Sequence, residues 1–431
     1  MPEILEIQNA LQSGSADRLL VRLYGSKPAG LLTQRRRYLR MLEQFSASFP
    51  AHTAVEYFST PGRAEVGGNH TDHNGGRVLA ASVDLDDLAV TAPTDTGVIT
   101  LLSEGYPQTV IDTRQLEIVA SEKNTSAALV RGVCARMREL GYRIGGFDAC
   151  ITSDVIKGAG ISSSAAFEVL IGTILDHLYN RGDMDPLLNA QIGQFAENRY
   201  FGKPCGLMDQ TTCAVGGFVT IDFQDFTRPL VRKVDFDFVA SGYALVIVDT
   251  GGSHADLTPD YAAIEREMKS VAQAFGGKVL REFSAQKVLD ELAFLRPRVG
   301  DRAVLRALHF YADDQRVVDE VTALQANDFP RFLELVVDSG RSSWMLNQNC
   351  YSPRDVAAQG VPVALEVSES VLKGRGGWRV QGGGFAGTIQ AFVPGDLLHA
   401  YLQRLSAVFG ESACHEMLIR PVGTTRLNLV P

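Results

Sequence analysis

Cysteine is scarce in this chain of 431 residues, and the six cysteines that occur are scattered: Cys134, Cys150, Cys205, Cys213, Cys350 and Cys414. They form no CxxC pair and no grouping with histidine at metal-ligand spacing. This pattern argues against a disulfide framework and against a zinc site. We therefore expect reduced thiols, as in a cytoplasmic protein.

Long apolar runs are also missing, since no stretch reaches the roughly 18 consecutive apolar residues of a membrane-spanning helix. The first residues, MPEILEIQNALQSG, lack a basic region followed by an apolar core. From these two features we expect a soluble, unsecreted protein that has no membrane partner.

Positive charge is not in excess either, because 50 acidic side chains face 41 basic ones and the formal net charge is −9. The densest basic run, Arg35–Arg37 with Arg40, is most simply the solvated face of a helix. This balance indicates no nucleic-acid partner.

Glycine, by contrast, is abundant, with 41 residues and no collagen-like period. Such an excess indicates several loops in which the backbone approaches something closely. With 45% apolar and 21% charged residues, the chain is an ordinary globular protein large enough for two hydrophobic cores.

Hydrophobic periodicity predicts helices and strands that come in runs rather than in strict alternation, which favours an α+β fold class. The first sixty residues are predicted to be rich in helix, and further helices are predicted over 125–140, 165–178, 261–275 and 397–409. Strands are predicted over 55–58, 77–100, 147–155, 243–250, 378–381 and 388–393. Without repeats, low-complexity tracts or long linkers, we expect two tightly packed domains, residues 1–238 and 239–431.

The segment 61–76, PGRAEVGGNHTDHNGG, is dense in hydrogen-bonding side chains. These are Arg63, Glu65, Asn69, His70, Asp72, His73 and Asn74, set among five glycines. Many polar groups on a backbone with few β-carbons suit a ligand with many hydroxyl groups. A surface turn without a ligand is the alternative interpretation.

The segment 158–166, GAGISSSAA, lies between a predicted strand and a predicted buried helix. Backbone N–H groups at a helix start, with close-approach glycines and serine hydroxyls, can cradle a phosphate, and a serine oxygen can ligate Mg²⁺. No GK[ST] follows, so this is not the usual nucleotide P-loop. Simple N-capping by the serines is the alternative.

Two further segments contain candidate catalytic or ligand-binding residues. Glu197 precedes CGLMDQ, in which Asp209 is a candidate buried carboxylate that a nearby cation would make useful as a base. Residues 382–387, GGGFAG, separate two predicted strands and are either a ligand loop or a common glycine-rich hairpin.

Together, these segments resemble the galactokinase branch of the GHMP small-molecule kinases, in order and over the full length. Residues 61–76 are similar to its sugar motif PGRxNxIGEHTDYxGG, and residues 158–166 to its phosphate loop GxGLSSSAA. Residues 202–210, GKPCGLMDQ, match GxPCGxMDQ, and residues 382–387 resemble GGGFGG. A weaker similarity covers residues 254–261, where that branch has a His and a Tyr at the spacing of His254 and Tyr261.

The resemblance implies a two-domain fold with an N-terminal ribosomal-protein-S5-like domain, a C-terminal ferredoxin-like domain and the active site in the cleft between them. It implies transfer of the γ-phosphoryl group of ATP, with Mg²⁺, to the anomeric hydroxyl of galactose, giving galactose 1-phosphate and ADP. The expected partners are the sugar and ATP, and the expected assembly is a monomer or a weak homo-oligomer.

The resemblance also implies residue roles. Asp209 would be the base for, or the partner of, the sugar hydroxyl, and Arg63 would lower the pKa of Asp209 and offset charge on the transferring group. The implied sugar contacts are Arg63, Asn69, His70, Asp72, Asp209 and Tyr261. The implied nucleotide contacts are Gly158, Ala159, Gly160, Ile161, Ser162, Ser163, Ser164, Gly383 and Gly384, and the implied Mg²⁺ ligands are Ser164 and Glu197.

Four departures from the branch affect the expected specificity for sugar and nucleotide. Asn69 replaces the Glu that accepts the sugar's C6 hydroxyl, and His73 completes HTDH as in galacturonokinases, so a kinase for galacturonate or another C6-modified sugar is the alternative. No new Arg or Lys in the motif would pair a uronate, which favours galactose. Ser126 replaces an aromatic residue that packs on adenine, and Asn349 begins a replacement of the usual Ser-His pair.

A second alternative, from a different class, is a non-catalytic galactose sensor of the same ancestry. A sensor would keep the fold and the ligands but lose turnover. The intact phosphate loop and the presence of Arg63 and Asp209 favour the enzyme.

Overall fold

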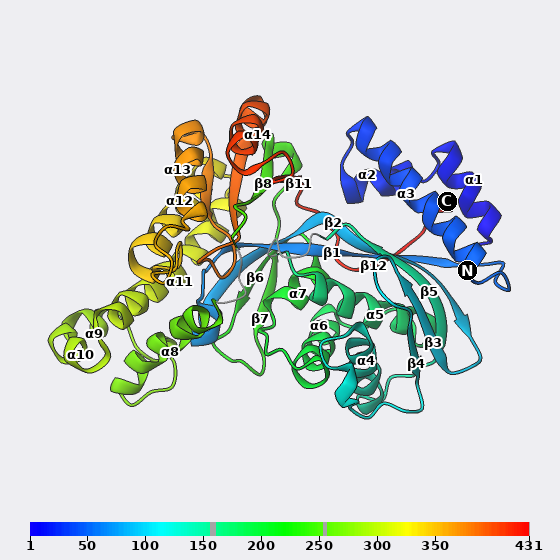
Figure 1. Cartoon of the computed structure of the whole chain (residues 1–431), viewed down its shortest axis with the longest axis horizontal. Coiled ribbons are helices and arrows are strands. Elements are labelled where there is room, and N and C mark those ends of the chain that lie inside the picture. The colour runs from blue at the N-terminus through cyan, green and yellow to red at the C-terminus, as the bar shows by residue number, and fades with distance from the viewer. Residues whose placement is uncertain (156–160, 253–256, 431) are drawn as a thin grey trace.

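The computed structural model describes residues 1–155, 161–252 and 257–430, which fold into two sheets with helices packed on them (Figure 1). The first sheet has eight strands, in the order β12-β1-β2-β5-β3-β4, with β6 paired to β2 and β7 to β6. Its strands are β1 (Glu56–Gly67), β2 (Arg77–Thr94), β3 (Val98–Ser103), β4 (Thr109–Asp112), β5 (Gly146–Ser153), β6 (Phe218–Asp222), β7 (Leu230–Val234) and β12 (Thr425–Leu427).

Helices cover both faces of this sheet (Figure 1). One face packs against α1 (Ile4–Ser13), α2 (Asp17–Tyr24) and α3 (Pro28–Ser48), which bury Tyr38 and Phe45 against the strands. The other face packs against α4 (Ser126–Glu139), α5 (Ser163–Tyr179) and α7 (Met208–Val215), and α6 (Pro186–Ala196) packs on these three helices. Strands β1 and β2 are buried over nearly their whole length, because helices cover both faces of the sheet.

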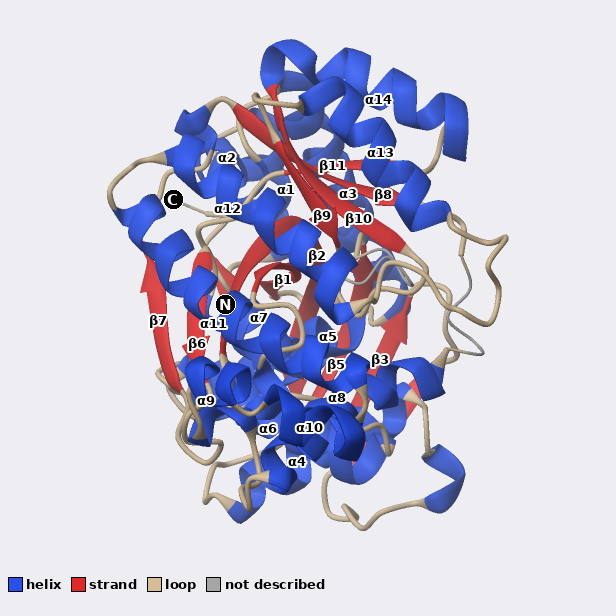
Figure 2. Ribbon diagram, turned by 90° about the vertical axis from the view of Figure 1, so that its left-hand side faces the viewer, coloured by secondary structure: helices blue, strands red, loops and turns tan. Residues whose placement is uncertain are grey.

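The second sheet has four strands in the order β11-β8-β10-β9, visible at the top of Figure 2. They are β8 (Tyr243–Asp249), β9 (Gly377–Val380), β10 (Thr388–Pro394) and β11 (Cys414–Met417). The helices of this half are α8 (Thr258–Ala274), α9 (Ala285–Asp290), α10 (Leu292–Val299), α11 (Asp301–Gln325), α12 (Phe329–Ser342), α13 (Gly360–Leu372) and α14 (Gly395–Phe409). The division of the chain at residue 238 stays a prediction. Strand β12, although it comes after that residue, joins the first sheet by pairing with β1.

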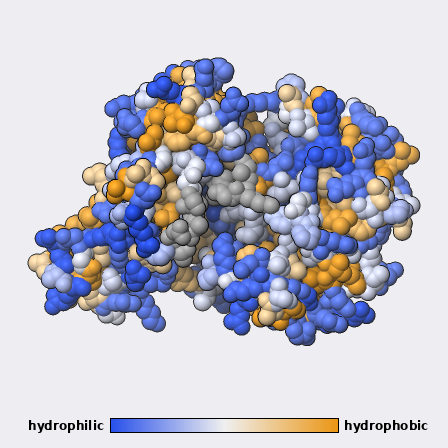
Figure 3. Space-filling model, viewed as in Figure 1, coloured by the Kyte–Doolittle hydropathy of each residue, from blue (hydrophilic) through white to orange (hydrophobic). Residues whose placement is uncertain are grey.

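The helices and strands predicted from periodicity are confirmed, with one adjustment. The predicted strand region 77–100 is divided in two, because β2 runs unbroken through Thr94 and a turn then leads into β3. Hydrophilic and apolar side chains are intermingled over the face in Figure 3, as is ordinary for a folded surface. Within the described ranges, we find no helix long and apolar enough to cross a bilayer.

Two short segments complete the elements that position the site. The one-turn helix η1 (Asp72–Asn74) follows β1, and the π-helical turn η3 (Glu197–Phe201) follows α6. A second π-helical turn, η6 (Ser343–Asn347), follows α12.

Candidate active site

Arg63 and Asp209 form a two-pronged ion pair between β1 and the first turn of α7. Arg63 Nε donates to Asp209 Oδ1 over 2.7 Å, and Arg63 Nη2 donates to Oδ2 over 2.8 Å. Burial raises the pKa of Asp209, but the Arg63 charge and the hydrogen bonds from Arg63 and Ser162 outweigh burial and lower it. The contact predicted between these two residues is therefore present, and Asp209 is ionised at neutral pH.

The phosphate-loop segment is tied to this pair. The Arg63 backbone N–H donates to Ile161 O over 3.1 Å, at an irregularity in the pairing of β1 with β2. Gly62 is required at this crossing, because a β-carbon there would lie 2.9 Å from Ile161 O. Ser162 donates from its hydroxyl to Asp209 Oδ2.

Ser162 precedes α5 in a left-handed conformation, with φ of 60°. Its side chain makes no capping hydrogen bond to the helix and contacts Asp209 instead. Simple capping therefore does not account for this serine, and a strained residue in contact with a carboxylate is typical of a functional loop. Gly158, Ala159 and Gly160, and also His254, lie outside the described residues.

Ser164 and Glu197 are in contact, as the predicted metal pair requires. Ser164 Oγ donates to Glu197 Oε1 over 3.0 Å, while Gln210 Nε2 donates to Glu197 Oε2 over 2.9 Å and to Glu168 Oε2 over 3.0 Å. Burial raises the pKa of Glu168 well above its usual range, and the neighbouring Glu197 raises it further. Glu197 is 2% exposed and lies next to the first turn of α5.

A hydroxyl and a carboxylate are the hard oxygen ligands that Mg²⁺ prefers, and Mg²⁺ in kinases takes the rest of its shell from phosphate and water. The Ser164–Glu197 pair fits that donor set. Within the described ranges, no cluster of three or more His, Cys, Asp or Glu side chains offers a fully protein-made metal site.

A cavity of about 770 Å³ opens beside Ser163 and Ser164. Segments of β3, β4, α4, α5 and η3 line it, and Ser126 is among the lining residues, as are the aromatic side chains of Tyr106 and Phe167. Asp87 also lines it, and burial raises the pKa of Asp87 to about 7. A cavity of this size next to the phosphate loop is large enough for a nucleoside.

The other predicted residues gather where the loop between β9 and β10 meets the segment after β1. His70 Nε2 donates to Gly383 O over 3.0 Å, and Tyr261 Oη donates to Gly384 O over 2.9 Å. Gly384 adopts φ of +79°, and a β-carbon there would lie 2.0 Å from Asn349 O, so only glycine fits. The structure thus places Gly383 and Gly384 beside the predicted sugar residues, and their nucleotide contact stays a prediction.

His70 is neutral, because burial lowers its pKa to about 3. Since the Gly383 carbonyl can only accept, Nε2 carries the proton and Nδ1 is left as an acceptor. Asp72 is partly exposed, and its Oδ2 would lie 3.1 Å from a β-carbon placed on Gly206, three residues before Asp209. His70 and Asp72 thus offer acceptors on the side of the site that carries Asp209.

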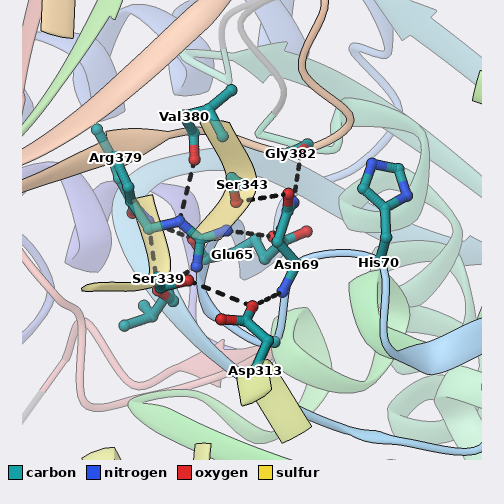
Figure 4. A network of polar contacts seen from close by, with 12 residues as sticks. Glu65, Asn69, His70, Asp313, Ser339, Ser343, Arg379, Val380 and Gly382 are labelled. Carbon is teal, nitrogen blue, oxygen red and sulfur yellow. Dashed lines mark hydrogen bonds and ion pairs between the residues drawn. The ribbon is translucent and has the colours of Figure 1, made fainter. Parts of the chain in front are cut away.

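Asn69 does not stand free in this site, because every polar group of the residue is bonded within the protein (Figure 4). Its Nδ2 donates to Glu65 Oε1 and to Gly382 O, each over 2.8 Å. Its Oδ1 accepts from Ser343 Oγ over 3.2 Å and from Asn349 Nδ2 over 2.9 Å. The residue is fully buried and joins four segments of the chain.

The carboxylate that the sugar motif has at position 69 is present at position 65 instead. The motif PGRxNxIGEHTDYxGG has Asn where this chain has Glu65 and Glu where it has Asn69, so the two residue types are exchanged. Glu65 Oε1 accepts from Arg379 Nη2 over 3.0 Å, and Arg379 also donates to Val66 O over 2.9 Å. Arg379 is fully buried, so Glu65 supplies its charge partner.

Sequence reasoning missed the residues that hold Asn69 in place. Asp313 Oδ2 accepts the Asn69 N–H over 2.7 Å, and His309 Nε2 donates to Asn69 O over 2.9 Å, both from the middle of α11. Neither residue lies in a motif. The buried Arg379 could have been found, because an arginine inside the apolar strand preceding a glycine loop signals a buried partner.

Two family models match segments of this chain that include the sugar motif and the phosphate loop. The profile of the GHMP kinases N terminal domain matches residues 128–217, and the galactokinase galactose-binding signature matches residues 43–93. The crystal structure of Lactococcus lactis galactokinase complexed with galactose is similar with a TM-score of 0.75 at 25% identity, covering 89% of this chain and 98% of that chain.

More distant structures share the fold. Methanococcus jannaschii mevalonate kinase gives a TM-score of 0.58 at 14% identity, covering 85% of this chain and 98% of that one. Streptococcus pneumoniae phosphomevalonate kinase, in complex with phosphomevalonate and AMPPNP, gives 0.56 at 14% identity, covering 86% and 99%. The two-domain α+β fold predicted from the sequence is confirmed.

Proposed function

Since the chain belongs to the galactokinase-type branch of the GHMP kinases, we propose that it phosphorylates the anomeric hydroxyl of galactose with ATP. The product would be galactose 1-phosphate, released with ADP. The observation that carries the proposal is the Arg63–Asp209 ion pair, with contacts of 2.7 and 2.8 Å, at the point where the sugar motif crosses the phosphate loop.

Asp209 accepts the hydrogen bond of the anomeric hydroxyl in this proposal. Its lowered pKa makes it a weak base, so it orients the hydroxyl and receives the proton only as the bond to phosphorus forms. Arg63 keeps the carboxylate ionised and offsets negative charge on the transferring group. Ser162 holds the second carboxylate oxygen and so fixes the direction of the first.

ATP would place its nucleoside in the cavity that Ser126 lines and its phosphates at the first turn of α5. Ser163 and Ser164 lie where cavity and helix meet. Mg²⁺ held by Ser164 and Glu197 would neutralise charge on the phosphates.

The sugar would lie between Asp209 and the loop that contains Gly383. His70 Nδ1 and the Asp72 carboxylate are acceptors for its hydroxyl groups. The bonds that occupy Asn69 leave it no free group for the C6 hydroxyl, so the exchange with Glu65 affects specificity through the shape of the site. The buried Arg379 is already paired with Glu65 and is therefore not available to a uronate, which supports galactose over galacturonate.

An ADP-release assay with galactose, galacturonate, N-acetylgalactosamine, arabinose and glucose tests the proposal. We expect the highest kcat/KM with galactose. Higher kcat/KM with galacturonate would establish the first alternative, and sugar binding without turnover of any sugar would establish the sensor.

Asp209→Asn tests the assigned mechanism, and we expect a loss in kcat of at least about 10²-fold with nucleotide affinity retained. Asp301→Asn is the matched control, because Asp301 also pairs with an arginine, Arg296, through two oxygens, at an exposed position on α11. Equal activity of Asp209→Asn and wild type would contradict the role of Asp209.

A further inference from the structure

Lys203 stands at a position that the motif GxPCGxMDQ leaves open, two residues after Phe201, which lines the cavity beside Ser163 and Ser164. The turn η3 closes behind it, since the N–H groups of Gly202 and Lys203 donate to Glu197 O over 2.9 and 3.2 Å. Gly202 adopts φ of +85° there, which reverses the chain. This reversal turns the Lys203 side chain back toward the residue at which η3 starts.

The Lys203 ammonium contacts the predicted metal ligand. Nζ lies 3.2 Å from Glu197 Oε1, and this same oxygen accepts from Ser164 Oγ over 3.0 Å. The ammonium and the first turn of α5 therefore share one carboxylate oxygen. The side chain of Lys203 is 61% exposed, so its ammonium is accessible to a ligand that enters from solvent.

Lys203 is also charged, and its ammonium has more hydrogen-bond donors than its contact with Glu197 requires. Burial lowers the pKa of Lys203, but Glu197 and then Asp209 outweigh burial and raise it. An ammonium has three donors, and Glu197 accepts from one of them. Arg63, in contrast, commits two nitrogens to Asp209.

A bound triphosphate would bring several negative charges to a place that already holds Asp209 and Glu197. Phosphoryl transfer depends on cations at the oxygens that gain charge. The Lys203 ammonium, which contacts Glu197, is also attracted by Asp209.

We propose that Lys203 binds the γ-phosphoryl group of the nucleotide and stays hydrogen-bonded to it during transfer from ATP to the sugar. This inference rests on the proposed function. In the step, the bond between the γ-phosphorus and the β–γ bridging oxygen breaks, and the electron pair stays on ADP. A bond from the anomeric oxygen to phosphorus forms, and the hydroxyl proton passes to Asp209. Lys203 donates to the non-bridging oxygens throughout and exchanges no proton.

The test compares AMPPNP and ADP, because only AMPPNP carries a γ-phosphoryl group. Isothermal titration calorimetry with saturating Mg²⁺ measures both affinities for wild type, Lys203→Met and Lys203→Arg. We expect Lys203→Met to weaken AMPPNP binding about 10- to 100-fold, as for loss of a charge-assisted hydrogen bond, and ADP binding less than about 3-fold. Lys203→Arg keeps the charge and should recover part of the loss.

Lys373→Met is the matched control, since Lys373 Nζ lies 3.3 Å from Glu369 on the surface of α13. It should leave both affinities unchanged. Equal loss for AMPPNP and ADP in Lys203→Met, or no loss for either, would overturn the inference, because neither result singles out the γ-phosphoryl group.

Turnover of galactose, measured on the same variants, separates this inference from the proposed function. Selective loss of AMPPNP affinity in a protein that turns over no sugar would refute the kinase activity and support the γ-phosphoryl contact of Lys203. Sugar turnover that is unchanged by Lys203→Met would refute that contact and support the kinase activity.

Discussion

The exchange of Glu65 and Asn69 makes a sharp prediction about reciprocal substitution. In Asn69→Glu, the two Nδ2 hydrogen bonds of 2.8 Å are lost, and a second carboxylate is placed beside Glu65. Loss of a hydrogen bond to a charged group costs about 1.5–3 kcal/mol, and the Gly382 carbonyl also loses a donor. We expect Asn69→Glu to lower the free energy of unfolding by about 3–5 kcal/mol.

Glu65→Asn should lower the free energy of unfolding by a similar amount, for a different reason. Arg379 is fully buried, and removal of its carboxylate leaves a buried charge without a partner. Such a loss costs about 3–5 kcal/mol.

The double variant Glu65→Asn/Asn69→Glu restores one carboxylate and one amide, in the order of the motif PGRxNxIGEHTDYxGG. We expect its destabilisation to be smaller than the sum of the two single losses by about 1–3 kcal/mol, since residues in direct contact couple by that amount. These four proteins (wild type, the two single variants and the double variant) form a double-mutant cycle. Urea unfolding measures the free energy of unfolding of each. Tryptophan fluorescence is a suited signal, because Trp378 is next to Arg379 and the chain has two tryptophans.

Asn69→Gln separates charge from size, because it keeps the amide and adds one methylene. It should cost less than Asn69→Glu. Losses that add to within about 0.5 kcal/mol in the double variant would refute the reasoning, since independent sites add in this way.

Three further outcomes are expected. Asp87 has a raised pKa of about 7, so between about pH 4 and pH 7 its carboxyl ionises in the unfolded chain but not in the folded one. The free energy of unfolding therefore falls as pH rises through that window, and Asp87→Asn should make this slope shallower in urea titrations at several pH values. Gly62→Ala would press a β-carbon against Ile161 O, so the apparent KM for ATP should rise by about tenfold. Gly30→Ala, where the added β-carbon would meet nothing closer than 4.0 Å, should leave that KM unchanged. Glu197→Gln should raise the Mg²⁺ concentration needed for half-maximal rate by at least about tenfold, and an unchanged Mg²⁺ titration would contradict its assignment as a ligand.

Local motifs predicted the contacts that depend on short, fixed backbone geometry. Arg63 and Asp209 meet because a strand and a helix start present them at motif positions, and Ser164 meets Glu197 for the same reason. These pairs follow from matched spacing even though more than thirty positions separate the partners in each pair.

The environment of Asn69 could not be predicted, because its partners come from α11, η6 and the β9–β10 loop. Each supplies an unremarkable polar residue, such as Asp313 or Ser343, whose importance depends on long-range packing. From the motif alone, Asn69 is interpreted as an altered sugar contact. In the structure, Asn69 and Glu65 have exchanged residue types and are bonded to each other.

The pairing of β12 with β1 has a consequence for how this protein is made. Strand β1 holds Arg63, and its outer edge is completed by residues 425–427 through the pairs Tyr57–Leu427 and Ser59–Thr425. Arg420 is fully buried and donates to Ser59 Oγ over 2.7 Å. Residues 425–427 follow the other described strands of the first sheet in the sequence, so during synthesis this edge of β1 stays open until they are available to pair. We therefore expect the nascent chain to need protection of that edge until residues 425–427 have left the ribosome.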